Sequence, residues 1–83
     1  MDFSKVQIGS FMVLKRRHRQ QNSPSNLIET IYCIIKHIEP VGNNYSRPKF
    51  IEIEQIIDLG AYLNNEPNYT KIPRTITNLN QYD

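Results

Sequence analysis

The sequence predicts one small domain that is mainly β, and three observations lead to this prediction. Eighty-three residues suffice for a single domain and are too few for two. The apolar stretches are dominated by isoleucine and other β-branched or aromatic residues, which prefer strands. Turn-forming residues separate these stretches, which suggests about four to five short strands. We expect residues 1–77 to form the domain, as a small bent sheet or barrel, with residues 78–83 as a C-terminal tail.

The N-terminal stretch, residues 3–15, predicts one or two strands. Val6 and Ile8 alternate with polar neighbours, and Gly9-Ser10 indicates a kink or bulge before the strand resumes. Phe11 to Leu14 is a continuous apolar run, which is typical of a strand covered on both faces. We therefore expect all four of its side chains in the core. The basic residues that follow either extend this strand or begin a polar loop.

Two structures compete for residues 27–39. The apolar side chains fall in one half of a helical wheel, Asn26 and Glu29 resemble a capping box, and Pro40 would stop a helix. Five isoleucines, a threonine and a tyrosine in the same segment nevertheless favour a strand. We predict the strand. The alternative is an α+β fold in which one helix at residues 26–38 packs on a three-stranded sheet.

As a strand, residues 27–39 alternate imperfectly. Ile31, Cys33 and Ile35 share one face. The opposite face then carries Tyr32, Ile34, Lys36 and Ile38. A strand buried on both sides tolerates this pattern.

The second half of the chain predicts a hairpin and an edge strand. Residues 41–48 are rich in turn formers, and residues 49–57 alternate isoleucine with glutamate as a half-buried strand does. A short apolar element follows at residues 61–63. Residues 70–77 can form only an edge strand, because Pro73 cannot donate to a ladder. This order of elements is similar to that of SH3-like barrels, with OB-like barrels as the neighbouring possibility.

The residues that could carry chemistry are few. Cys33 is the only cysteine, which excludes an internal disulfide, and neither histidine lies at a metal-ligand spacing from it. The three glycines are isolated, so no phosphate-binding loop exists, and Glu52 and Glu54 alternate with isoleucine as the solvated face of a strand does. We expect a packed thiol, no metal, no cofactor and no enzymatic activity. No signal peptide or membrane span is indicated, so we expect a soluble intracellular protein.

Positive charge is concentrated in one place. The net charge is only +2, but five consecutive residues form a dense basic cluster, and we predict that they bind a polyanion: Lys15, Arg16, Arg17, His18 and Arg19. If the two loops lie on the same side, Arg47 and Lys49 extend the patch and Tyr45 offers a ring for base stacking. A solvated patch, with its arginines paired to Glu29, Glu52 or Glu54, is the structural alternative.

We therefore expect a non-enzymatic binding module that docks through a basic loop at residues 15–19. Its predicted partner is nucleic acid, contacted at the phosphates without sequence reading, with the chain as a small subunit of a larger assembly. The alternative is a protein-binding accessory factor or inhibitor, of the kind that viruses and phages encode, which recognises an acidic protein surface. No membrane partner is expected.

Overall fold

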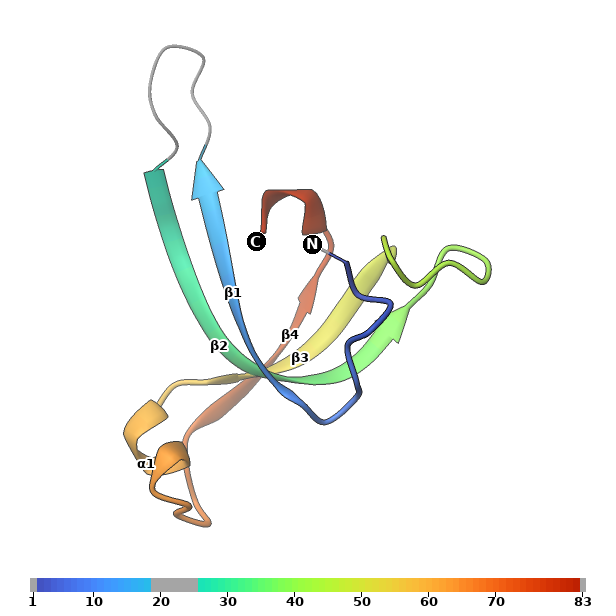
Figure 1. Ribbon diagram of the computed structural model, residues 1–83. Helices are drawn as coiled ribbons and strands as arrows, with labels where there is room; N and C mark the ends of the chain where they lie inside the picture. Colours follow the sequence, from blue (N-terminus) through green and yellow to red (C-terminus); the bar gives the residue numbers. More distant parts are fainter. Residues whose placement is uncertain (1, 19–25, 83) are drawn as a thin grey trace.

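The computed structural model describes residues 2–18 and 26–82. The strands in these ranges form one antiparallel sheet. Its strand order follows the chain, and a short helix and a 3-10 turn complete the regular structure (Figure 1). The elements are β1 (Phe11–His18), β2 (Asn26–Glu39), β3 (Phe50–Ile56), α1 (Leu59–Leu63), β4 (Lys71–Ile76) and η1 (Leu79–Gln81). The prediction of a mainly β domain with a small bent sheet is confirmed. A helix at residues 26–38 is wrong, because that segment is β2.

The long strand β2 is the element on which the sheet is built. Its 14 residues pair with β1 over 26–34 and with β3 over 33–39, so the two ladders overlap only at Cys33 and Ile34. Figure 1 shows β2 curving strongly between its two partners. Residues 26–32 therefore form a two-stranded ribbon with β1 alone. In the described part of the chain no ladder joins β1 to β4, so the sheet is open rather than a closed barrel.

A β-bulge at Lys36 decides which side chains of β2 enter the core. Ile35 lies opposite Ile53, but His37 rather than Lys36 lies opposite Glu52, so β2 has one extra residue there. The extra residue returns Ile38 to the face of Ile35, and Ile38 is only 7% exposed. The expectation that Ile38 shares a face with Tyr32 and Ile34 is therefore wrong, because strict alternation does not continue through a bulge.

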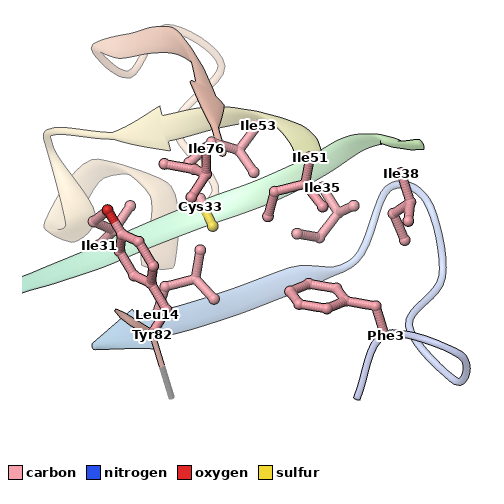
Figure 2. Packing of buried hydrophobic residues seen from close by; sticks show 10 residues of the cluster. All are labelled: Phe3, Leu14, Ile31, Cys33, Ile35, Ile38, Ile51, Ile53, Ile76 and Tyr82. Atoms are coloured by element: carbon pink, nitrogen blue, oxygen red, sulfur yellow. The ribbon is translucent and has the colours of Figure 1, made fainter. Parts of the chain in front are cut away.

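The core lies on one face of the sheet, which we call the inner face. Isoleucines from β2, β3 and β4 pack there with Leu14 of β1 and with two aromatic side chains from the ends of the chain (Figure 2). The buried residues are Phe3, Leu14, Ile31, Cys33, Ile35, Ile38, Ile51, Ile53, Ile76 and Tyr82. Burying a side chain of this size contributes about 1.5–3 kcal/mol, so this cluster provides most of the driving force for folding.

The apolar run of β1 is less buried than expected. Leu14 is fully buried and Met12 packs partly against the core, but Val13 is half-buried and Phe11 is 40% exposed. The expectation that all four side chains are core is wrong, because the core covers one face of β1 only. Val13 and Phe11 belong to the opposite face, which we call the outer face.

Helix α1 covers part of the outer face. Ile56 at the end of β3 is 3% exposed and Ala61 of α1 is 6% exposed, although neither belongs to the inner-face cluster. Asp58 caps the helix, since its carboxylate accepts a hydrogen bond of 3.0 Å from the backbone N–H of Ala61. The short apolar element expected at residues 61–63 is thus the second half of α1.

The two chain ends pack against the sheet without forming strands of their own. A strand through Val6 and Ile8 is wrong, because residues 2–10 form turns and Ile8 is 59% exposed. Gly9, with φ of 90°, provides the expected kink before β1. At the other end, residues 79–81 form η1, and Tyr82 makes an antiparallel bridge to Arg16 and lies in the core. The segment set apart as a tail therefore contributes a core side chain.

Candidate nucleic-acid interface

The basic cluster lies in strand β1 rather than in a loop. Residues 15–18 pair with residues 30–26 of β2, with a bulge between Arg16 and Arg17. His18 is the last residue of β1, and Arg19 lies outside the described residues. The expected basic loop at 15–19 is therefore corrected to the end of a strand, at least as far as His18. The ladder continues to His18 because Lys, Arg and His side chains do not interrupt backbone pairing, whereas proline, which has no N–H to donate, would.

Strand geometry divides the cluster between the two faces of the sheet. The bulge between Arg16 and Arg17 has its extra residue, Ile28, in β2, so alternation continues along β1. Successive side chains of a strand point to opposite faces, and Lys15 and Arg17 therefore share the outer face with Val13. Arg16 shares the inner face with Leu14, where it is half-buried next to the bridge with Tyr82. A partner on the outer face therefore meets Lys15 and Arg17 together, but not Arg16.

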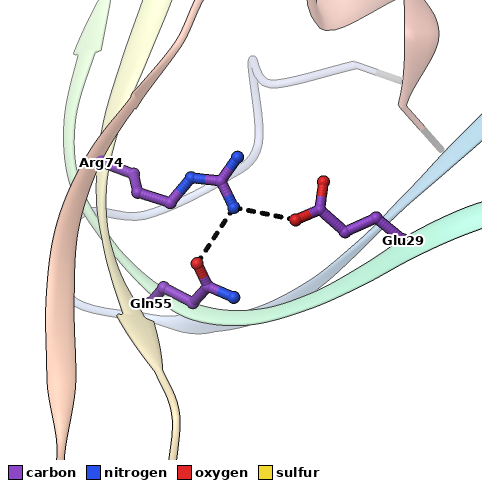
Figure 3. Close-up of polar contacts among 3 residues, drawn as sticks. All are labelled: Glu29, Gln55 and Arg74. Carbon is purple, nitrogen blue, oxygen red and sulfur yellow. Dashed lines mark hydrogen bonds and ion pairs between the residues drawn. The ribbon is translucent and has the colours of Figure 1, made fainter.

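Two acidic side chains of the sheet, Glu29 and Glu54, are paired with cations of other strands. Arg74 of β4 donates from Nη1 to Glu29 Oε2 at 3.1 Å and to Gln55 Oε1 at 3.0 Å (Figure 3). Glu54 lies 3.7 Å from Lys36 Nζ and 3.6 Å from Lys71 Nζ. Two of the three carboxylates that the solvated-patch alternative required are thus in contact with residues outside the cluster.

Lys15 keeps its charge unneutralised. Its side chain is exposed, and among residues 2–18 and 26–82 no carboxylate forms an ion pair with it or with Arg16. The nearest acid in the ladder is Glu29, directly opposite Arg16, but Glu29 contacts Arg74 instead. The basic end of β1, defined here as the exposed Lys15 and the half-buried Arg17 on the outer face, is therefore a source of positive potential.

Tyr45, Arg47 and Lys49 lie at the other end of β2. They belong to the β2–β3 connection, and the N–H of Lys49 donates to the carbonyl of Glu39, the last residue of β2. From Thr30, the partner of Lys15, to Glu39 is nine residues of strand, or roughly 30 Å along the backbone. Arg47 instead lines a depression of about 450 Å³ beside Phe3, Pro48 and Leu79. The structure does not bring these residues together with the cluster.

Four aromatic rings form a row on the outer face, which the sequence did not predict. The rings follow one another in the order Tyr32 of β2, Phe11 of β1, Tyr62 of α1 and Tyr69 of the segment before β4. The centroid distances along this row are 6.5, 5.4 and 5.3 Å, and Lys71 Nζ lies 5.2 Å from the centre of the last ring. Only strand alternation of Phe11 and Tyr32 was visible in the sequence, and the contacts with α1 required the fold.

Cys33 is a buried thiol on the inner face. Burial raises its pKa from 9.0 to about 11, because desolvation disfavours the thiolate, although the nearby Arg74 guanidinium opposes this slightly. The thiol donates a weak hydrogen bond of 3.5 Å to the carbonyl of Met12. Such an environment suits packing and not nucleophilic chemistry.

Within the described residues no group of three or more histidine, cysteine or acidic side chains is close enough to hold a metal ion. No helix in the described ranges is both long and apolar enough to cross a membrane. No family model matches the chain, and no curated protein or solved structure is significantly similar to it.

Proposed function

We propose that this protein is a non-enzymatic binding module that docks on nucleic acid through the basic end of β1, by contacts to phosphates. The observation that carries the proposal is the exposed Lys15, which has no acidic partner in the described structure, next to Arg17 on the same face. Glu29, next to Lys15 in the ladder but on the inner face, contacts Arg74, and Glu54 on the outer face contacts Lys36 and Lys71. The Lys15 ammonium therefore stands at the surface as a positive charge that no carboxylate of the described residues neutralises.

Phosphate contact follows from the chemistry of these two side chains. The guanidinium of Arg17 presents parallel donors that match phosphate oxygens, and the Lys15 ammonium acts as a compact point charge. Contact with a polyanion releases its condensed counterions, which gives affinity that does not depend on base sequence and weakens as salt increases. The ladder to β2 already fixes the backbone of both residues, so little backbone entropy is lost on binding.

The experiment compares two double variants that remove the same amount of charge. Lys15→Ala with Arg17→Ala removes the proposed site, and Arg47→Ala with Lys49→Ala removes two cations at the other end of β2. Binding of the full chain to a labelled oligothymidylate and to a labelled duplex is measured by fluorescence anisotropy at several salt concentrations. Circular dichroism establishes that each variant keeps its fold.

We expect only the variant with Lys15→Ala and Arg17→Ala to bind the two nucleic acids weakly. Loss of two phosphate contacts should also reduce the log–log salt slope by about 1.4 for the single strand and about 1.8 for the duplex. Equal losses in both double variants would show general attraction to a basic protein and would refute the site. Binding to poly-L-glutamate but to neither nucleic acid would favour the alternative partner, an acidic protein surface.

A further inference from the structure

We propose that the aromatic row Tyr32–Phe11–Tyr62–Tyr69 stacks against unpaired bases, so that the ligand of this protein is a single-stranded nucleic acid. The inference rests on the proposed function, since the same strand would place its phosphates at Lys15 and Arg17. It goes further by naming the ligand as a single strand rather than a duplex, and by assigning binding residues outside the basic cluster.

The exposure of Phe11 is the first support. Its ring is packed nearly parallel to two others, at 6.5 Å and 21° to Tyr32 and at 5.4 Å and 13° to Tyr62. A ring that served only to anchor α1 would be expected to lie beneath it, yet Phe11 is 40% exposed. Three rings of the row are thus already ordered as a stack, and Tyr69 meets Tyr62 edge-on at 73°. Part of Phe11, the middle ring of the three, remains open to solvent, which suits the addition of a flat base.

The position of the row relative to the cations is the second support. Lys15 lies opposite Thr30, and Tyr32 is two residues further along the same face, so the two are diagonal neighbours. The Cβ atoms of such neighbours are roughly 7–8 Å apart, which is within reach of one nucleotide's phosphate and base. Lys71 lies over the Tyr69 ring at the other end of the row. Cations therefore flank a line of rings, as in proteins that bind single strands by stacking.

The charges on the outer face favour a strand that follows the row. Glu54 is the acid nearest to it in the sheet, because it pairs with Ile34, the partner of Phe11. Lys36 and Lys71 both contact Glu54, so its repulsion of phosphates is reduced. Duplex bases are stacked on one another and offer no free plane, so only a single strand can use the rings.

The test uses substitutions that remove a ring and keep apolar bulk. Phe11→Leu and Tyr32→Leu are compared with Tyr45→Leu, which removes an exposed ring at the other end of β2, outside the row. We expect the first two to weaken binding of an oligothymidylate of about 12 nucleotides by about five- to hundredfold. Binding to a duplex of the same length should be unchanged, and Tyr32→Phe should bind the oligothymidylate as the natural protein does.

A measurement on the natural protein keeps the inference testable if a variant does not fold. Titration with the oligothymidylate should shift the NMR signals of the Phe11 and Tyr32 ring protons upfield, but not those of Tyr45. Single-strand binding without ring shifts, or with unchanged affinity in Phe11→Leu, would overturn the inference and leave the proposed function standing. Binding to neither nucleic acid would overturn both.

Discussion

The bulge at Lys36 places Ile34 and Ile38 on opposite faces of the sheet, whereas strict alternation would place them on the same face. The two residues should therefore differ in how much they contribute to stability. In the structure Ile38 is 7% exposed in the core, whereas Ile34 is half-buried on the outer face. We therefore expect Ile38→Val to destabilise the domain and Ile34→Val to have little effect. Ile35→Val, at a residue that is fully buried next to the bulge, serves as the reference.

The expected size follows from the methyl group that each change removes. A buried isoleucine replaced by valine costs about 0.5–1.5 kcal/mol of unfolding free energy, so Ile38→Val and Ile35→Val should each lose about 1 kcal/mol. Ile34→Val should lose about 0.5 kcal/mol or less, since a half-exposed methyl is only partly transferred from water on folding. A domain of this size has a total free energy of unfolding of about 3–5 kcal/mol, so all three variants should remain folded.

Urea unfolding measures the difference. With a slope of about 1 kcal/mol per molar urea, the midpoints of Ile38→Val and Ile35→Val should fall by about 1 M. Circular dichroism and tyrosine fluorescence should give coincident transitions, which supports a two-state analysis. An equal loss in Ile34→Val and Ile38→Val, or a larger loss in Ile34→Val, would refute the bulge and with it the register of β2 on β3.

Three further predictions concern the inner face. Because burial raises the pKa of Cys33 from 9.0 to about 11, the unfolded chain loses the thiol proton first as pH rises. The unfolding free energy that this group contributes below pH 9 should therefore be lost as pH rises toward 11, and urea unfolding should show a smaller loss for Cys33→Ala over the same range. A double-mutant cycle between Arg74 and Glu29 should give a coupling free energy of about 0.5–1 kcal/mol that decreases in high salt. A coupling of zero would mean that the contact of 3.1 Å does not help to hold β4 against β2. Replacing Tyr82 by Ala should lower the free energy of unfolding by about 3–5 kcal/mol and leave the domain largely unfolded at room temperature. A cooperative unfolding transition at the midpoint of the natural protein would show that the C-terminal segment is dispensable.

Much of the fold was predictable from local sequence. The isoleucine-rich composition of residues 27–39 favoured β2 over a helix, alternation with glutamate indicated β3, and Pro73 indicated that β4 lies at an edge. These inferences succeeded because β-branched side chains and a missing backbone donor act within a strand and its immediate partner. The cluster of positive charge was likewise visible without a structure.

Local sequence thus indicated the four strands of the sheet and the concentration of charge, but it also predicted a strand through Val6 and Ile8 that does not form. Which face of the sheet each residue occupies depends on the packed structure. The bulge at Lys36 moved Ile38 into the core, and strand alternation placed Lys15 and Arg16 on opposite faces. The long, bent β2 kept Arg47 away from the cluster, and α1 brought Tyr62 onto Phe11. The physical reason is that a face is set by ladder register and by contacts between distant segments, which depend on the whole packing arrangement.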